Sequence, residues 1–202
     1  IDSGSVTSYT VNSTSSLPTS VSRTGYTFAG WKATVVAGNW ELNKVYANPT
    51  ASNATDKTKV LTGMYGNVTL SAQWTVNRYE VTFNAKGGTF ADGADVDAYV
   101  VYGTQSYYTT ETGTTAYTFL VPTRAGYTFL GYADSEIADS AANTVALADY
   151  IKYESGSFTV VKNWDKATDA TLYAVWKTNS YTITYNANGG TGADQTVNIN
   201  FN

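Results

Sequence analysis

The fold is decided by a stretch that the chain contains twice: Gly126-Tyr127-Thr128-Phe129-Leu130-Gly131-Tyr132 and, earlier, Gly25-Tyr26-Thr27-Phe28-Ala29-Gly30-Trp31. Two further blocks recur in the same order and at nearly the same spacing: residues 68–74 with 170–176, and 79–89 with 181–191. A unit of this size copied in tandem is a small domain, not one turn of a solenoid. Tandem domains usually provide reach or multiple contacts, not chemistry.

Composition narrows the class of protein. The chain has 202 residues, which fits about two domains of ordinary size. Charged residues make up only 14% and the net charge is −4, so Thr, Ser, Asn and Tyr must cover the surface, which favours a secreted protein. Because there is no basic cluster, we predict no nucleic-acid partner. No apolar run approaches the ~20 residues of a membrane span, so we predict no membrane insertion. Both ends read as internal to a longer chain.

The residue types that usually carry catalysis are scarce. The chain has no Cys and no His, so thiolate chemistry and the commonest general base and metal ligand are missing. The shared blocks contain no repeated acid. We therefore predict no catalytic residues, no cofactor and no enzyme activity. Asp92, Asp95 and Asp97 cluster after one turn, but they lack the alternating ligand pattern of a calcium loop, and we predict no metal.

Alternating residues predict strands and identify the core. Leu, Ala and Trp alternate with other residues in both copies of the closing strand, and Tyr and Phe alternate in both copies of the Gly-Tyr-Thr-Phe block. At strand spacing these aromatic residues indicate core, with a sugar-stacking platform as the alternative. The predicted structural core is Tyr26, Phe28, Leu70, Ala72, Trp74, Tyr127, Phe129, Leu172, Ala174 and Trp176.

The opening block predicts a hairpin. Tyr181, Ile183 and Tyr185 share one face of a strand, and a return strand is expected at 196–201; its earlier copy starts at Tyr79 and returns at 98–102. Adjacent glycines, Gly87 with Gly88 and Gly189 with Gly190, are expected to supply the positive φ of the tight turn.

Between the shared blocks the copies diverge, in segments 32–67 and 133–169. Residues 134–151 are compatible with one short helix capped by Asp139. The predicted fold class is therefore mostly β, with α+β possible and at most one short helix in each unit. The units are a first repeat, 1–76, lacking its opening strand, a complete second repeat, 79–178, and the opening hairpin of a third, 179–202. Only four residues separate neighbours, so we expect a semi-rigid array.

These blocks resemble the Listeria–Bacteroides repeat, the B-repeat of internalin-type surface proteins. The opening pattern lies at 79–88 and 181–190, the Pro-Thr-Arg-x-Gly-Tyr-x-Phe-x-Gly centre at 122–131, and the Leu-Tyr-Ala-x-Trp close at 172–176. Tyr132 stands where the family usually has Trp. The resemblance implies tandem β-grasp, ubiquitin-like modules in cell-surface proteins, and it supplies no catalytic residue.

Together these observations predict a non-enzymatic repeat module of a bacterial cell-surface protein, placed outside the cell as a stalk or adhesion spacer. The alternative is a ligand-binding module that contacts a glycan or a host protein through segments 32–67 and 133–169, because loops on a rigid scaffold commonly bind ligands. We also expect head-to-tail self-association. A sheet that lacks a strand exposes an edge, to which Tyr181, Ile183 and Tyr185 of another molecule can add.

Overall fold

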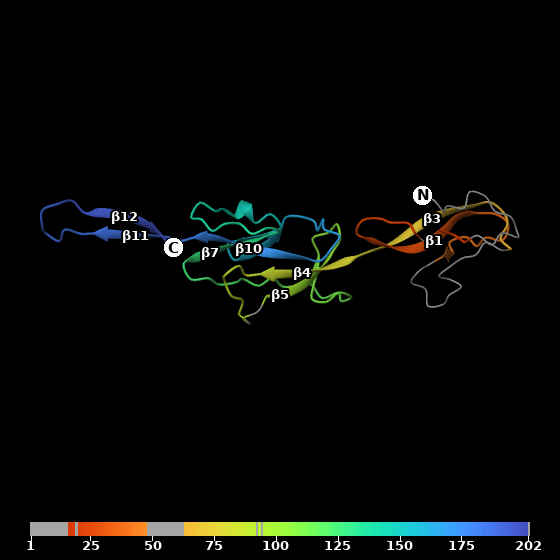
Figure 1. Ribbon diagram of the computed structural model, residues 1–202, viewed down its shortest axis with the longest axis horizontal. Helices are drawn as coiled ribbons and strands as arrows, with labels where there is room; N and C mark the ends of the chain where they lie inside the picture. Colours follow the sequence, from red (N-terminus) through yellow and green to blue (C-terminus); the bar gives the residue numbers. More distant parts are fainter. Residues whose placement is uncertain (1–15, 19, 48–62, 92, 94, 202) are drawn as a thin grey trace. The chain divides into compact units, whose positions relative to one another are not determined.

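The computed structural model describes residues 16–18, 20–47, 63–91, 93 and 95–201, and all structural statements here concern these residues. The chain separates into two compact units, residues 1–77 and 78–202. Strands provide nearly all the regular structure, and the single helical element of the described part is a 3-10 turn, η1, Val145–Leu147 (Figure 1). The predicted mostly β fold class is confirmed, whereas the β-grasp arrangement stays a prediction.

Unit 1 contains a three-stranded antiparallel sheet of order β2-β1-β3. Its strands are β1, Tyr26–Val36, β2, Val45–Tyr46, and β3, Val68–Val76. The two repeated blocks pair with each other, because Phe28 of β1 lies opposite Trp74 of β3. The buried cluster of this unit consists of Leu17, Ala33, Trp40, Tyr46, Ala47 and Met64.

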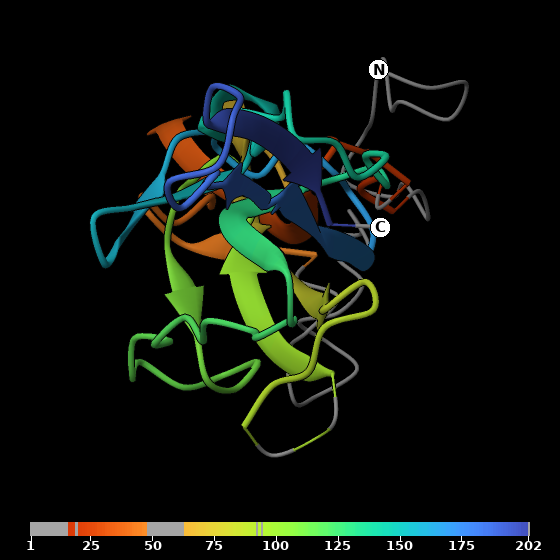
Figure 2. The ribbon, with the colours of Figure 1, turned by 90° about the vertical axis from the view of Figure 1, so that its left-hand side faces the viewer.

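Unit 2 contains a seven-stranded sheet of order β6-β5-β4-β10-β7-β8-β9 (Figures 1 and 2). The strands are β4, Arg78–Asn84, β5, Val96–Val101, β6, Tyr107–Tyr108, β7, Tyr127–Ala133, β8, Ile151–Glu154, β9, Ser157–Val160, and β10, Ala170–Thr178. All neighbours are antiparallel except β4 and β10, which run parallel with Val81 opposite Ala170. The opening and closing strands of the repeat therefore lie next to each other in the middle of the sheet.

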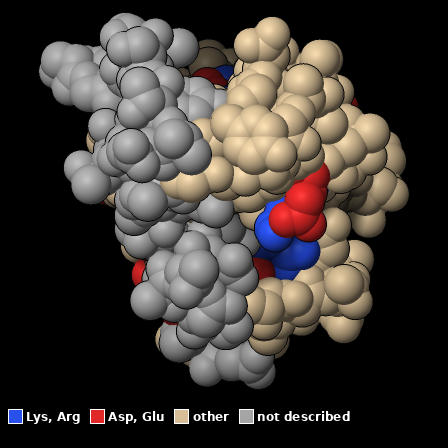
Figure 3. Space-filling model, turned by 90° about the vertical axis from the view of Figure 1, so that its right-hand side faces the viewer, with Lys and Arg blue, Asp and Glu red and all other residues tan. Residues whose placement is uncertain are grey.

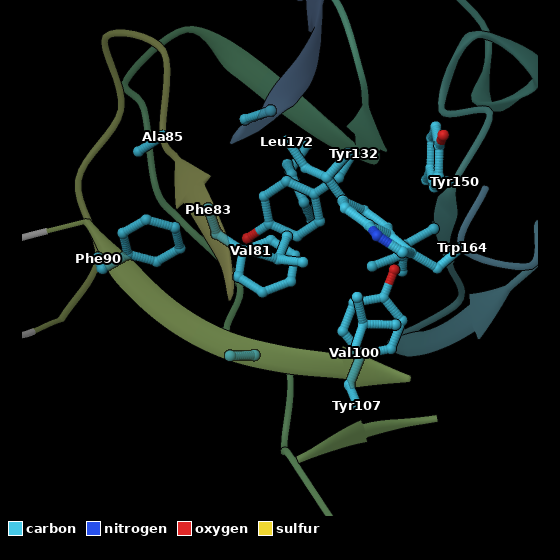
Figure 4. Packing of buried hydrophobic residues seen from close by; sticks show 14 of the residues in the cluster. Val81, Phe83, Ala85, Phe90, Val100, Tyr107, Tyr132, Tyr150, Trp164 and Leu172 are labelled. Atoms are coloured by element: carbon cyan, nitrogen blue, oxygen red, sulfur yellow. The ribbon is translucent and has the colours of Figure 1, made fainter. Parts of the chain in front are cut away.

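The core of unit 2 is strongly aromatic. Figure 4 shows Phe83, Tyr132 and Trp164 directed into one interior, together with aliphatic residues of β4, β5 and β10. The Phe83 and Tyr132 ring centroids are 4.8 Å apart. Inclined ring pairs of this kind add about 0.5–1.5 kcal/mol beyond the burial of their area. Aromatic packing therefore supplies much of the specificity of a core that has no disulfide.

A separate two-stranded hairpin follows the sheet of unit 2. It is formed by β11, Ser180–Tyr185, and β12, Gln195–Asn200, with Tyr181 opposite Ile199. The two return strands agree with the sequence-based expectation to within two residues. Every residue of both strands is exposed, because this hairpin has no third strand or second layer beside it in the described chain.

The short helix that segment 134–151 could have held does not form. The segment contains the 3-10 turn η1, preceded by Thr144, and ends at Ile151, the first residue of β8; Asp139 caps no helix. Two alanines, one asparagine and one threonine follow Asp139 and Ser140, but the Asn143 side chain bonds to backbone carbonyls outside any helix. Tertiary contacts therefore override the weak local preference for a helix.

Candidate functional site

The residues that hold one repeat to the next gather at the end of unit 2 where β10 leads into β11. Asn179 lies between the two strands, and its backbone N–H donates to the Gly126 carbonyl at 2.9 Å. The Thr128 hydroxyl donates to Asn179 Oδ1 at 2.6 Å. The backbone N–H of Phe201, just after β12, donates to the Asn179 carbonyl at 2.9 Å. The linker backbone is thus bonded to the repeat before it and to the hairpin after it.

Aromatic contacts complete this arrangement. Phe201 packs against Tyr127 with ring centroids 5.5 Å apart, and the Arg124 guanidinium lies 3.7 Å from the Tyr127 ring centroid. Gly126 is required here, because a Cβ at this position would lie 2.3 Å from the Phe201 ring, and its φ is +80°. We call Arg124, Gly126, Tyr127, Asn179 and Phe201 the repeat junction.

Unit 1 contains the same contacts on the side of the linker that precedes the next repeat. The Asn77 N–H donates to the Gly25 carbonyl at 2.9 Å, and the Thr27 hydroxyl donates to Asn77 Oδ1 at 2.6 Å. Arg23 lies over Tyr26, 3.8 Å from the ring centroid. The Gly-Tyr-Thr motif, the arginine before it and the asparagine after the closing strand are therefore one structural device that the chain uses twice.

A charged cluster, the turn clamp, holds the tip of the β4–β5 hairpin. It consists of Lys86, Arg124 and Asp139. Asp139 accepts hydrogen bonds from Lys86 Nζ at 3.1 Å and from Arg124 at 2.6 Å, and Lys86 also donates to the Ile137 carbonyl. Burial alone would raise the pKa of Asp139, but the hydrogen bonds from Arg124 and Lys86 and their charges lower it below its ordinary value. The clamp is a structural ion triad and offers no free acid or base.

The turn itself corrects the expected role of its glycines. Lys86 and Gly87 are the two residues with positive φ, 46° and 80°, and the Gly88 N–H donates to the Ala85 carbonyl at 3.0 Å. This is a tight turn with two left-handed central residues, and it begins the longer connection, residues 85–95, between β4 and β5. Gly88 supplies space and not positive φ, because a Cβ there would lie 2.6 Å from the Trp176 ring. Trp176 in turn donates from Nε1 to the Ala85 carbonyl at 3.0 Å.

The structure places the predicted core residues of the two repeats differently. In unit 2, Leu172, Ala174 and Trp176 are at most 1% exposed, and Phe129 is buried with Tyr127 half-buried at the junction. In unit 1, Phe28 is buried, whereas Tyr26, Leu70, Ala72 and Trp74 are half-buried. The sequence pattern treats the two sets as equal, but the described chain buries four of the five residues of the second set and only one of the five of the first.

Segment 133–169 forms part of the core, which the sequence alone did not reveal. It supplies Tyr150, Ile151 and Trp164, all fully buried. The Tyr150 hydroxyl donates to Asp165, which also pairs with Lys162 at 3.1 Å. Burial, and then the hydrogen bond to Asp165, raise the pKa of Tyr150 above its ordinary value. The other variable segment, 32–67, is described only up to residue 47 and from residue 63.

A signal for part of this region was present in the sequence. Ile151 and Tyr153 alternate before Ser155-Gly156, and Phe158 and Val160 alternate after it. Ser155 and Gly156 both have positive φ, so they form the two-residue turn of the β8–β9 hairpin. Alternation on both sides of a small polar residue and a glycine is the usual hairpin signal.

A small hollow of the described surface lies among aromatic residues of unit 2, and the acidic cluster singled out in the sequence is described only in part. One hollow of about 260 Å³ is lined by Tyr107, Tyr117, Phe119 and their neighbours, below the usual range for drug-sized ligands. Asp92 lies outside the described residues, and Asp95 accepts a hydrogen bond from Asn84. Within the part of the chain that the structure describes, no three His, Cys, Asp or Glu side chains come together.

In the coloured part of Figure 3 a group of blue and red atoms lies side by side at the surface. In unit 1 the oppositely charged Lys44 and Glu41 are paired. Among the described residues no helix has the length and hydropathy needed to span a bilayer.

Comparisons with known proteins agree with the repeated pattern. The profile of the Listeria–Bacteroides repeat domain matches residues 2–73, 79–149 and 181–201. A protein of Evansella cellulosilytica named "Putative Gly-rich membrane protein" is 31% identical over 175 residues, covering 84% of this chain and 16% of that protein. A second one from the same organism, named "Putative membrane protein", is 26% identical over 179 residues, covering 86% of this chain and 19% of that protein.

This chain thus spans less than one fifth of the length of either relative. No solved structure matches it. The family profile covers most of the chain in three successive matches, each beginning within a few residues of a unit or hairpin boundary described above. The chain belongs to the Listeria–Bacteroides repeat domain family, in agreement with the resemblance of its repeated blocks.

Proposed function

We propose that this chain is a non-enzymatic, semi-rigid spacer segment of a bacterial cell-surface protein, exposed outside the cell. The repeat family supports a role as a repeat module of surface proteins. The two relatives, both named as membrane proteins and far longer than this chain, agree with a segment of a large surface protein. As a spacer it extends a chain between an anchor and a distal domain and carries out no reaction.

The observation that carries this proposal is the repeat junction. A flexible tether would leave the Asn179 backbone to water, but here both its N–H and its carbonyl are bonded, and its side chain accepts from Thr128. Phe201 adds an aromatic contact to Tyr127. Net values of about 0.5–1.5 kcal/mol for each such hydrogen bond are enough to favour one orientation of hairpin β11–β12 strongly over others.

Distances between spin labels test this orientation directly. The chain has no Cys, so Thr159→Cys and Thr184→Cys, both at exposed positions, can be labelled without further changes. Pulsed electron resonance should give one narrow distance distribution. In the Asn179→Gly background the distribution should broaden, whereas Asn188→Gly at the hairpin tip should leave it narrow. A broad distribution in the unmodified background would contradict a semi-rigid spacer.

The cellular part of the proposal has its own test. Protease treatment of intact bacteria that produce the full-length parent protein should release fragments of these repeats while cytoplasmic markers stay intact. Repeats that are cleaved only after lysis would contradict exposure at the cell surface. A screen of the isolated chain against glycans and host proteins tests the alternative, because specific binding that maps to segments 32–67 or 133–169 would favour a ligand-binding module.

A further inference from the structure

Arg124 belongs both to the turn clamp and to the repeat junction. Its Nη1 donates to Asp139 Oδ2 at 2.6 Å, and its guanidinium lies 3.7 Å from the Tyr127 ring centroid. The Tyr127 ring in turn packs against Phe201, which directly follows β12. A guanidinium that is bonded to a carboxylate keeps its plane fixed and can stack steadily on an aromatic ring. Asp139 is therefore linked to the junction through one side chain.

The segment that carries Asp139 also holds the other side of the junction. The Ser140 carbonyl accepts the backbone N–H of Thr178 at 3.1 Å, one residue before Asn179. Asp139 and Ser140 are adjacent in the chain, so one short segment bonds to Arg124 on one side and to the end of β10 on the other. The two sides of the repeat junction are thus held together by the same segment.

Asp139 is the contact of this segment whose charge can change. The bond between Ser140 and Thr178 joins backbone groups, and the Asn143 side chain donates to the Trp176 carbonyl at 2.8 Å. Amides of this kind do not titrate, whereas a carboxylate becomes neutral when it binds a proton and then attracts a cation far less. Acid therefore acts on one side of the junction and leaves the bonds to β10 in place.

The charges around Asp139 determine the pH at which this happens. Lys86, in the turn after β4, donates to Oδ1 at 3.1 Å, and Arg124 donates to Oδ2. Glu136 of the same segment and Lys177 of β10 are exposed, and neither is bonded to Asp139 in the described structure. Burial raises the pKa of Asp139, but the hydrogen bonds and charges of Arg124 and Lys86 lower it more. The carboxyl is therefore ionised at neutral pH and binds a proton only in acid.

We propose that the ionised Asp139 carboxylate holds the repeat junction in one arrangement through Arg124, and that protonation of Asp139 in acid frees hairpin β11–β12 to reorient. A cation–aromatic contact at a partly exposed site is weak by itself, so without the carboxylate the Arg124 guanidinium turns into water. The Tyr127 ring then loses the contact that fixes it, and Phe201 loses a fixed surface to pack on. This inference rests on the proposed spacer function, because it describes how the stiffness of the spacer depends on pH.

Spin labels at Thr159→Cys and Thr184→Cys report the orientation of the hairpin in the full chain. The native background should give one narrow distance distribution at pH 7, and its width should increase at least about twofold as the pH falls below about 4. Asp139→Asn should give the broad distribution already at pH 7. The matched control is Asp134→Asn, which removes a similarly exposed carboxylate paired with Lys166 at 2.9 Å and should stay narrow at pH 7.

The pH of the transition identifies the group that controls it. Lys86→Asn removes one of the cations that lower the pKa of Asp139, so the distribution should broaden at a higher pH than in the native background. A midpoint that is unchanged in Lys86→Asn would assign the transition to another group and overturn the proposal. Arg124→Lys keeps a cation beside Asp139 but lacks the planar group that stacks on Tyr127, and it should broaden the distribution at pH 7.

Two further measurements separate the possible outcomes. Near-UV circular dichroism should stay unchanged across the transition, because the aromatic core of unit 2 remains folded while the hairpin reorients. A narrow distribution for Asp139→Asn at pH 7 would overturn the inference and leave the semi-rigid spacer intact. So would a native distribution that is still narrow when the carboxyl carbon signal of Asp139 shows that it is protonated.

A broad distribution for the native background at pH 7 would instead contradict the spacer itself. Where acid unfolds unit 2 before Asp139 is protonated, the comparison of Asp139→Asn with Asp134→Asn at pH 7 decides.

Discussion

The closing strands β3 and β10 use the same residues and end in different surroundings. Both present Leu, Ala and Trp on one face and pair with the strand of a Gly-Tyr-Thr-Phe block. In β10 this face is fully buried, whereas in β3 it is half-buried. The difference is the opening hairpin, since β4 lies beside β10 and no described strand lies beside β3 on that side. The alternating residues thus determine that a strand forms and which of its faces is apolar, and the neighbouring hairpin determines how much of that face is buried.

The largest effect that tests this comparison is expected at the two tryptophans. Trp176→Ala should lower the free energy of unfolding of unit 2 by about 3–5 kcal/mol, as for other large buried aromatics. Trp74→Ala should cost about half as much in unit 1, because less of its surface is removed from water. Urea denaturation of the full chain followed by circular dichroism gives both values. The exposed neighbours provide controls, since Lys177→Ala and Thr75→Ala should stay within ~0.5 kcal/mol. Equal losses for the two tryptophans would mean that the Trp74 face is covered.

The turn glycines give the next largest contrast. Gly88→Ala should destabilise unit 2 by about 1–3 kcal/mol, because the new methyl group forces the Trp176 ring to move. Gly190→Ala should change stability by less than ~0.5 kcal/mol in a dilute, monomeric sample. Thermal melting curves at low protein concentration measure both. Tolerance of alanine at residue 88 would show that Trp176 can shift at little cost.

The turn clamp distinguishes unit 2 by its response to pH. Asp139→Asn should cost about 1–2 kcal/mol at pH 7, because it leaves Lys86 and Arg124 partly buried without a negative partner. The folded-state pKa of Asp139 is below its ordinary value. Its contribution is therefore complete above the unfolded pKa of about 4 and is lost as pH falls through the lower folded pKa. Melting temperatures between pH 6 and pH 2 should converge for the native chain and the variant, and a constant difference would argue against the clamp.

The smallest expected effect tests the buried polar atoms in the core of unit 2, some of which have no hydrogen-bond partner. Tyr107 is 5% exposed, and Figure 4 shows its ring directed toward Trp164. Neither the Tyr107 hydroxyl nor Trp164 Nε1 has a hydrogen-bond partner in the described structure. Tyr107→Phe should change stability by less than ~1 kcal/mol and in the stabilising direction, because it removes an unpaired buried hydroxyl. Chemical denaturation is the measurement, with Tyr132→Phe as the contrasting variant. Tyr132 donates to the Leu120 carbonyl at 2.8 Å, so its loss should destabilise.

The repeated blocks were enough to predict the strands they form, because their alternation is strong and occurs twice. They did not reveal Tyr150 and Trp164, which lie where the copies diverge and no internal comparison was possible. A short helix near Asp139 was considered from local preference alone, whereas the structure places Asp139 in ion pairs with Lys86 and Arg124. Such long-range pairings cannot be read from spacing along the chain.

The junction was predictable only in part. The four-residue linkers indicated close neighbours, and the arginine before Gly-Tyr-Thr-Phe was a reasonable partner for an aromatic ring. The role of Asn179 depends on three backbone and side-chain hydrogen bonds to Gly126, Thr128 and Phe201, all distant from it in the sequence. The need for Gly126 likewise comes from Phe201, a residue that follows it by most of a repeat.

The parallel pairing of β4 with β10 has a mechanical consequence. The chain enters the repeat at the start of β4 and leaves it at the end of β10, and parallel strands place these two points at opposite ends of the pair. Tension applied through Arg78 and Thr178 therefore pulls the two strands past each other in shear, and it loads their hydrogen bonds together and not one after another. We expect a high unfolding force in single-molecule pulling along this direction. Pulling through Arg78 and Val101, which are paired across the antiparallel β4–β5 hairpin, should instead unzip the bonds in sequence at a much lower force.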